Sequence, residues 1–376
     1  MGESKKDASQ LREVHHLLMQ GKSAEGHVRL TQITDEPPEQ RKEFDYLQAW
    51  NAVLQERWED VTQQIRDIPA LLRAEERESL LTNGSIRRRR PICLLILGEL
   101  ARELGYPEEA TEHLQHCLAL LNERRMNIPE VRLLAHCNLG RLALEMNQTA
   151  QALIQYETAS ELCGDEEAEH FIFIMILTGL CETSMRLGRF EQALSAGKQA
   201  LLLLRTNPSS GCQEPLLLML SRISLSLEDT ASALAYAQDA RHVANQANDP
   251  ARVANSLLVL AEIHYKAHQM QEARTNCQHT LALLSTPQNQ PLRATTLFLS
   301  GKIAEAEWHY QPEQEKLATE ALECYEQARA IFDTLHDASA LAKVSRRLAQ
   351  LLEGRGQPEL ALTHWKNAYM LSEQRG

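Results

Sequence analysis

The stretch LGELARELGYPEEATEHL, from Leu97 to Leu114, recurs with changes along much of this 376-residue sequence. Three further copies are LGRLALEMNQTAQALIQY (139–156), LCETSMRLGRFEQALSAG (180–197) and LAEIHYKAHQMQEARTNC (260–277). In each copy an apolar residue precedes a small one, a turn follows seven positions later, and an alanine stands five positions after the turn. Self-similarity at a period of about 40 residues is the signature of a repeat architecture.

Two columns of positions follow the repeat through seven copies. Because small residues let two helices approach closely where they cross, the columns predict hairpins of a helix A and a helix B. The small residues are Gly98, Gly140, Cys181, Ser221, Ala261, Gly301 and Ala349. The alanines are Ala110, Ala152, Ala193, Ala233, Ala273, Ala321 and Ala361, at spacings of 42, 41, 40, 40, 48 and 40 residues.

This spacing resembles that of the tetratricopeptide repeat family. An aromatic residue four positions past the alanine, as at Tyr156, Tyr325 and Trp365, adds to the resemblance. Weaker copies with Val61 and Gly26 in the alanine place extend it toward the N-terminus. The resemblance implies an all-α, right-handed superhelical solenoid of about nine antiparallel helix pairs, with residues 1–376 as a single array.

The repeat length narrows the resemblance. Repeats of about 40 residues are longer than the usual tetratricopeptide unit and imply longer helices. They are similar to those of bacterial Rap-type proteins, of the sensor arms of MalT-like regulators, and of kinesin light chain. The resemblance therefore implies either a protein-binding scaffold or the sensor part of a signalling regulator.

Composition agrees with a helical protein and limits its partners. Aromatic residues are only 5% of the chain, and leucine and alanine, which lose little entropy in a helix, are abundant. A formal net charge of -12 argues against a general nucleic-acid surface, because such surfaces neutralise phosphates with lysine and arginine. No apolar segment is long enough for a membrane span or a secretion signal, so we expect a cytoplasmic protein without a membrane partner.

Two irregular spacings mark enlarged segments. One is a connection at 72–90, which ends in the run Arg87, Arg88, Arg89 and Arg90; the other is an insertion at 302–320. Insertions in repeat proteins map to surface loops that often bind partners. The arginine run is interpreted as a solvated loop partly neutralised by neighbouring glutamates, with a loop that binds an acidic partner as the alternative.

The resemblance also implies a partner groove. In the tetratricopeptide family, helix A lines the concave face at positions one, four and five past the small residue. A column of alternating charge results: Glu99, Arg141, Glu182, Arg222, Glu262 and Lys302. Either the column forms a self-neutralised ladder that fixes repeat stacking, or it contacts a partner directly.

A second column is apolar in its middle. The column consists of Arg102, Leu144, Met185, Leu225, Tyr265 and Glu305. One turn before the small residue on the last three of these predicted helices lie Leu218, Leu258 and Phe298. These residues either pack against neighbouring helices or form an apolar floor that accepts a peptide or helix. The predicted site is therefore a groove centred between Leu144 and Tyr265.

Signatures of catalysis are not found. No phosphate-binding glycine loop, HExxH or nucleophile elbow occurs, and the eight cysteines form no CxxC pair, so we expect buried thiols. The helical pairs His113/His116 and His264/His268 lack the second cluster that a four-ligand zinc site needs. We expect no enzyme activity, no cofactor and no metal.

The sequence thus favours a non-enzymatic scaffold that binds a protein or peptide in its concave groove. The alternative is the peptide- or signal-sensing domain of a bacterial regulator whose output domain is not in this chain. Nucleic-acid contact through the arginine run is a weaker third hypothesis. The last helix leaves Leu360, Trp365 and Met370 without a capping helix, which suggests self-association at that end or a fragment of a longer chain.

Overall fold

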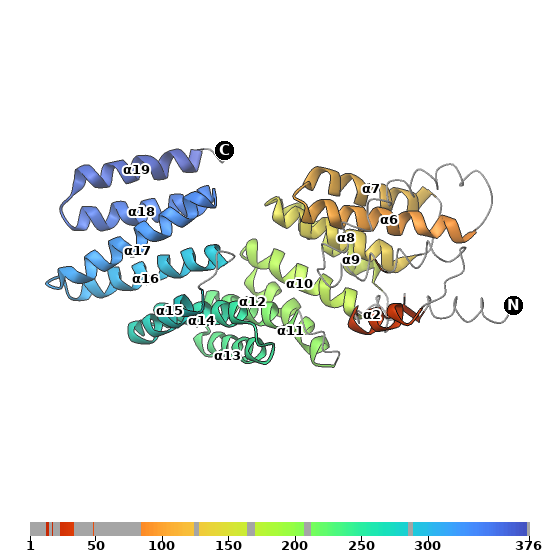
Figure 1. Ribbon diagram of the computed structural model, residues 1–376, viewed down its shortest axis with the longest axis horizontal. Helices are drawn as coiled ribbons and strands as arrows, with labels where there is room; N and C mark the ends of the chain where they lie inside the picture. The colour runs from red at the N-terminus through yellow and green to blue at the C-terminus, as the bar shows by residue number, and fades with distance from the viewer. Residues whose placement is uncertain are drawn as a thin grey trace. The chain divides into compact units, whose positions relative to one another are not determined.

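The computed structural model describes residues 13–14, 17, 23–33, 48, 84–123, 128–163, 170–206, 212–284 and 289–373. Within these ranges the regular elements are α-helices that follow one another as antiparallel pairs (Figure 1). The helices are α2 (Ser23–Thr31), α6 (Gly84–Glu103), α7 (Pro107–Glu123), α8 (Pro129–Glu145), α9 (Thr149–Leu162), α10 (His170–Arg186), α11 (Phe190–Thr206), α12 (Gln213–Ser226), α13 (Thr230–Gln246), α14 (Pro250–Lys266), α15 (Met270–Leu283), α16 (Gln290–Tyr310), α17 (Glu315–Thr334), α18 (Ala338–Gly354) and α19 (Pro358–Glu373).

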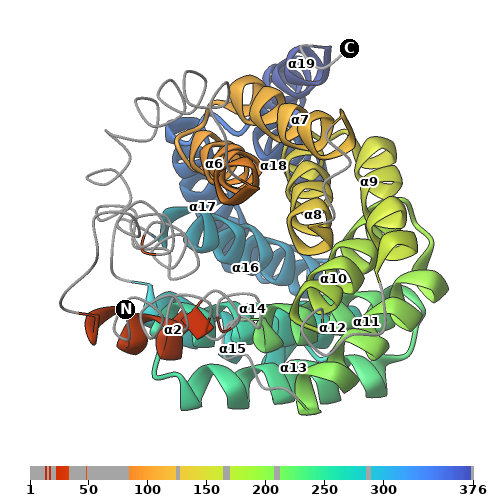
Figure 2. The same ribbon diagram turned by 90° about the vertical axis from the view of Figure 1, so that its right-hand side faces the viewer.

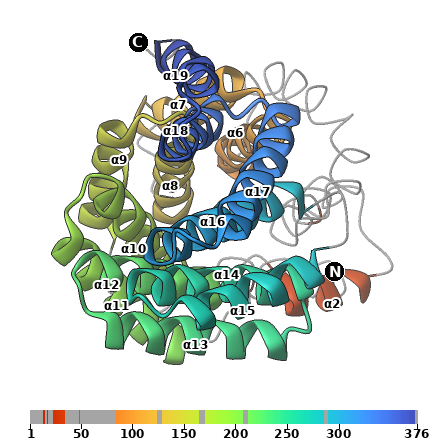
Figure 3. The same cartoon turned by 90° about the vertical axis from the view of Figure 1, so that its left-hand side faces the viewer.

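The chain divides into two compact units, Met1–Ser210 and Gly211–Gly376. The first unit contains the hairpins α6/α7, α8/α9 and α10/α11 (Figure 2), and the second contains α12/α13, α14/α15, α16/α17 and α18/α19 (Figure 3). The all-α hairpin architecture is therefore confirmed. The weak copy at Val61 lies outside the described residues, and a single solenoid over residues 1–376 stays a prediction.

Within each unit the helices form two layers. In the second unit the A helices α14, α16 and α18 lie on the inner side, and the B helices α13, α15, α17 and α19 on the outer side (Figure 3). The helices pair because the alanine column is fully buried, as at Ala233, Ala273 and Ala321, where relative exposure is 0%. This arrangement brings the A-helix columns of successive repeats onto one face.

The small column lies where helices A and B cross. A Cβ atom on Gly98 would stand 2.6 Å from Leu114 Cγ, and one on Gly301 would stand 2.6 Å from Tyr325 Cδ1. Such separations are far below van der Waals contact, so a larger residue would force the two helices apart. The predicted close crossing of each hairpin is confirmed at these positions.

The turns repeat as regularly as the crossings. In six of the seven hairpins between residues 84 and 373, the residue seven positions past the small one has a positive φ. The next backbone N–H donates to a carbonyl five residues earlier, as from Tyr106 to Ala101 at 2.8 Å, which is the Schellman arrangement. The positive-φ residues are Gly105, Asn147, Gly188, Glu228, His268 and Gly356.

The structure of residues 302–320 differs from the inserted loop that the sequence predicted. Helix α16 has 21 residues and α17 has 20, against 17 and 14 in α14 and α15. The additional residues lengthen both helices of one hairpin, and only 311–314 connect them. Trp308 is buried in this extension, and Arg274 on α15 pairs with Glu307 on α16 and with Glu320 on α17.

The arginine run also differs from the prediction. Helix α6 begins at Gly84, so the backbone of Arg87–Arg90 is helical and belongs to helix A of the next repeat rather than to a loop. Pro91 lies inside the same helix. Residues 72–83 of the predicted connection lie outside the described residues, and binding of an acidic partner by the arginines stays a prediction.

The described helices include none that is long and apolar enough to cross a membrane.

Candidate functional site

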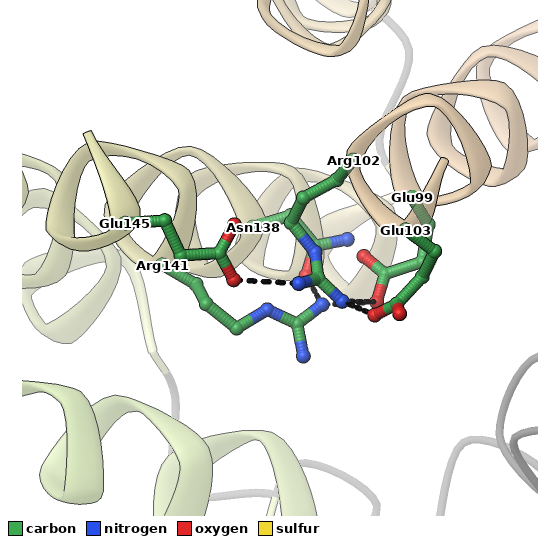
Figure 4. A network of polar contacts seen from close by, with 6 residues as sticks. All are labelled: Glu99, Arg102, Glu103, Asn138, Arg141 and Glu145. Atoms are coloured by element: carbon green, nitrogen blue, oxygen red, sulfur yellow. Dashed lines mark hydrogen bonds and ion pairs between the residues drawn. The ribbon is translucent and has the colours of Figure 1, made fainter. Parts of the chain in front are cut away.

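The A-helix charges of the first unit meet in a closed network. Arg102 on α6 donates to Glu145 on α8 at 2.6 Å and lies 3.4 Å from Glu99, and it also pairs with Glu103 (Figure 4). Arg141 on α8 reaches back to Glu99 on α6. Two arginines and three glutamates therefore pair with one another across the two helices.

The centre of the network lies largely out of solvent. The side chains of Glu99 and Arg102 have relative exposures of 12% and 11%. Burial by itself lowers the pKa of Arg141, but Glu99 more than offsets this, so the net effect raises its pKa. Arg141 also donates to Asn138 Oδ1 at 3.3 Å. These charges fix α6 against α8, which confirms the first step of the predicted ladder.

The ladder does not continue regularly along the first unit. Glu182 pairs with Arg186 of its own helix at 2.5 Å, and Arg186 also donates to the Leu144 carbonyl oxygen at 2.9 Å. The Leu144 side chain is buried, with a relative exposure of 4%, while Met185 is half-buried. Leu144 is thus a core residue rather than a floor open to a partner.

The second unit contains a pocket of about 530 Å³ on the corresponding face. Three A helices, α14, α16 and α18, supply most of its wall, and α12 and Phe332 of α17 complete it. The lining combines apolar and aromatic side chains with charged ones. It consists of Arg222, Leu225, Ser226, Glu262, Tyr265, Lys266, Thr295, Phe298, Leu299, Lys302, Phe332, Asp337, Ala340, Lys343 and Val344.

The structure brings together most of the groove residues predicted on the second unit. Arg222, Leu225, Glu262, Tyr265, Phe298 and Lys302 all line this pocket. Leu218 and Leu258 do not, because they are buried to 3% and 1% relative exposure and belong to the core beneath it.

Aromatic and ionic contacts shape the pocket. Lys302 Nζ lies 4.6 Å from the centre of the Tyr265 ring, a cation–π arrangement. Phe298 packs on Tyr325 with ring centres 5.6 Å apart, and the Tyr325 hydroxyl donates to buried Glu305 at 2.5 Å. The walls are therefore held from behind by a buried polar contact.

Charge is less balanced here than in the first unit. Arg222 pairs with Glu262 at 3.6 Å. After Glu99 and Arg141, this is the second pair of the predicted ladder that the structure contains. Burial lowers the pKa of Lys302, and nearby Arg347 and Lys266 lower it further, against the opposing effect of Glu262 and Glu305. Lys302 is thus a partly desolvated cation among other cations.

The sequence prediction missed the contribution of α18. Lys343 and Val344 line the pocket, and Arg346 and Arg347 line a smaller one of about 300 Å³ that shares Phe298, Lys302 and Lys343 with it. Arg346 stands three positions before Ala349, the same offset that Phe298 has from Gly301. Extending that column by one repeat would have found it.

In the described ranges, no three His, Cys, Asp or Glu side chains are placed to hold a metal ion. Burial raises the pKa of the Cys117 thiol to about 12, which disfavours a reactive thiolate, although nearby Arg132 acts in the opposite direction. His264, one of the histidines considered above as a zinc ligand, instead contacts a neighbouring side chain, with Nδ1 2.6 Å from Gln269 Oε1.

The hairpins, the crossings and the pocketed A-helix face define an all-α helical-repeat protein built from antiparallel helix pairs. No protein-family model and no curated protein matches the sequence. Solved structures do match: the apo quorum sensor NprR of B. thuringiensis has a TM-score of 0.73 at 13% identity, covering 98% of this chain and 99% of that one.

Two Rap structures are similar over nearly the whole length. Apo RapI gives a TM-score of 0.67 at 11% identity, covering 98% of this chain and 97% of that one. A Rap protein complexed with competence and sporulation factor gives 0.60 at 12% identity, covering 94% and 99%. The chain therefore has the fold that NprR and the Rap proteins share.

Proposed function

We propose that this chain is a non-enzymatic recognition scaffold that binds a peptide segment in the second-unit pocket. The observation that carries the proposal is that Tyr265, Phe298 and Lys302, from two successive A helices, line one pocket of about 530 Å³. Small-ligand sites are typically clefts of about 300–1,000 Å³ with apolar walls and a few placed polar groups.

The comparisons support the same kind of ligand. One Rap structure of this fold is complexed with competence and sporulation factor, and a Rap conjugation gene regulator, with a TM-score of 0.56, is in complex with the Phr* peptide. A fold that accommodates peptides in other proteins is suited to a peptide here. The identities of 12% and 14% leave the ligand of this chain to be found by experiment.

The experiment is selection of short random peptides from a display library by the purified full chain. Selected peptides are then synthesised, and their affinities are measured for wild type and for the double variant Tyr265→Ala/Phe298→Ala. We expect the variant to lose at least about tenfold in affinity, because buried aromatic contacts dominate such sites. The matched control is Tyr310→Ala/Tyr369→Ala, which removes two rings exposed by 70% and 62%.

Equal affinity of the two double variants would contradict a peptide site in this pocket. The non-enzymatic part has its own test, since another structure of the fold is an aspartyl phosphate phosphatase from Bacillus subtilis, with a TM-score of 0.61 at 12% identity. Incubation with a protein that carries aspartyl phosphate should leave its dephosphorylation rate unchanged. A rate that increases with the amount of this chain would overturn that part.

A sensor role is the second candidate, favoured by the likeness to the quorum sensor NprR. In that role, peptide binding would shift the arrangement of helices and so act on an output domain or partner protein. Small-angle X-ray scattering of the chain with and without a selected peptide tests it. A changed scattering profile on binding supports the sensor, and an unchanged one supports the passive scaffold.

A further inference from the structure

A row of cations crosses the pocket of the second unit. Lys302 of α16 and Lys343, Arg346 and Arg347 of α18 line the smaller pocket together with Phe298 and Gln350. Lys302, Lys343 and Phe298 also line the larger pocket, so the two hollows share a wall. The cationic row therefore borders the apolar hollow directly.

The acids around these hollows are already engaged. Glu262 lies 3.6 Å from Arg222, and Glu305, buried beneath the wall, accepts from Tyr325 and lies 3.9 Å from Arg347. Asp337 caps α18 by accepting from the Ala340 N–H at 2.9 Å. Each carboxylate thus has a partner within the fold.

The cations outnumber these carboxylates. Six basic side chains line the two hollows, against Glu262 and Asp337 in the lining and Glu305 behind it. Among the described residues no carboxylate lies within ion-pair distance of four of the six. The six are Arg222, Lys266, Lys302, Lys343, Arg346 and Arg347, and the four are Lys266, Lys302, Lys343 and Arg346.

Such clustering raises the free energy of the empty pocket. Like charges that lie close together repel one another, and they do so more strongly where the protein excludes water. The pKa of Lys302 is lowered first by burial, and repulsion from Arg347 and Lys266 contributes to the same shift. A ligand that brings negative charge into the row relieves this repulsion, whereas a neutral ligand does not.

Resting on the function proposed above, we propose that the pocket binds an acidic peptide segment. An aliphatic or aromatic side chain of the segment occupies the hollow between Tyr265, Phe298 and Phe332. Two side-chain carboxylates next to it in the peptide pair with Lys302, Lys343 and Arg346. The negative net charge of the whole chain favours a short acidic peptide over a long polyanion, which would be repelled outside the pocket.

The test begins with parallel selections from one unbiased display library. One bait is the wild-type chain, and the other is Lys343→Glu/Arg346→Glu, both positions being exposed. The control bait, Lys316→Glu/Lys366→Glu, makes the same charge change at exposed positions on the outer helices α17 and α19. We expect the wild type and the control to enrich peptides with two or more acidic residues beside an aliphatic or aromatic one, and the pocket variant to lose that enrichment.

Affinities of one enriched peptide then give the magnitude. Replacement of its acidic residues by Asn or Gln should weaken binding to wild type at least about tenfold, since two charge-assisted contacts are lost. The pocket variant should bind the parent peptide at least about tenfold more weakly than the control variant does. Thermal unfolding followed by circular dichroism confirms that all three chains are folded.

Other outcomes separate the two proposals. A wild type that selects no peptide contradicts the proposed function itself. Selected peptides without acidic enrichment leave that function standing and overturn the acidic-segment inference. The inference also fails if binding depends on a free C-terminal carboxylate rather than on acidic side chains. It fails as well if phosphoserine in place of the acidic residues is needed for binding.

Discussion

The two units place charged side chains at the same register positions and use them differently. In the first unit, Glu99, Arg102, Arg141 and Glu145 form ion pairs with one another between α6 and α8. In the second unit, the corresponding face has an apolar pocket edged by six cations, four of which lack carboxylate partners among the described residues. Charges that cancel hold helices in register, and charges left in surplus next to apolar walls create a place for a ligand.

The largest expected effect tests the closed network. Arg102→Ala would remove the cation shared by Glu99, Glu103 and Glu145, and would leave Glu99, about one-tenth exposed, with Arg141 alone. Removal of one partner from a buried pair costs about 3–5 kcal/mol, so we expect the lower end of this range. Urea unfolding followed by circular dichroism measures it.

The matched control is Arg222→Ala in the second unit, whose single ion pair with Glu262 is far more exposed. Its cost should stay below about 1 kcal/mol. Equal losses for Arg102→Ala and Arg222→Ala would show that the network is no more stabilising than an ordinary surface pair.

Salt should separate the two regions next. The affinity of the second unit for an acidic peptide should fall by about tenfold between about 0.05 M and about 0.5 M salt. At the higher concentration, salt screens the attraction between exposed charges beyond a few ångströms. The cost of Arg102→Ala should change much less, since buried pairs are screened weakly. Fluorescence anisotropy and urea unfolding at both salt concentrations provide the comparison. A salt-independent affinity would point to an apolar ligand instead.

Substitutions in the turns should change the free energy of unfolding by a smaller amount. The sign should differ between a turn of the first unit that has glycine at the positive-φ position and a turn of the second unit that has glutamate there. Gly188 and Glu228 hold the same positive-φ position, at φ 72° and 63°. A side chain in this conformation costs about 1 kcal/mol or slightly more, so Glu228→Gly should stabilise the chain and Gly188→Ala should destabilise it by about that amount. Urea unfolding measures both, and no heavy atom within 4 Å of a Cβ on Gly188 complicates the second variant. Changes of the same sign would contradict this explanation of the turns.

The smallest effect concerns pH and Lys302. In the free chain, burial first and then Arg347 and Lys266 hold the pKa of Lys302 below its usual 10.5, whereas bound carboxylates would raise it again. Affinity for an acidic peptide should therefore be complete below the pKa of the free chain. It should fall by about two- to fivefold as pH rises through that value. Calorimetry in buffers of different ionisation enthalpy should show proton uptake, and Lys302→Met should abolish it.

Much of the fold could be predicted because each hairpin requires the same kinds of residue at the same positions, so the requirement appears in the sequence as a repeat. Gly98, Gly140 and Gly301 permit close crossings, and a Schellman turn follows at a fixed distance in six hairpins. Spacing alone could not show how the additional residues at 302–320 would be used. Their composition, AEAEWHY, contained a signal, since alanine and glutamate favour helix extension over a loop.

The site was less predictable, because an alternation of charge along the repeats does not determine with which opposite charge each side chain forms an ion pair. Arg141 pairs with Glu99, but Glu182 finds Arg186 four residues away on its own helix. The i, i+4 spacing of that pair was visible in the sequence and competes with pairing between repeats. The cations of α18 were also visible, although only after the column of Phe298 is continued to Arg346.

Tyr156 links two neighbouring repeats in a way that constrains how this sequence can change. Cβ atoms added to Gly140 on α8 and to Gly179 on α10 would stand 2.8 Å and 2.2 Å from its ring. One ring thus occupies space reserved by glycines on two different helices. Neither glycine can acquire a side chain first without a clash, and loss of the ring first leaves a void. Evolutionary change at this junction would have to pass through a less stable protein or alter several residues together. Positions 140, 156 and 179 should therefore change together.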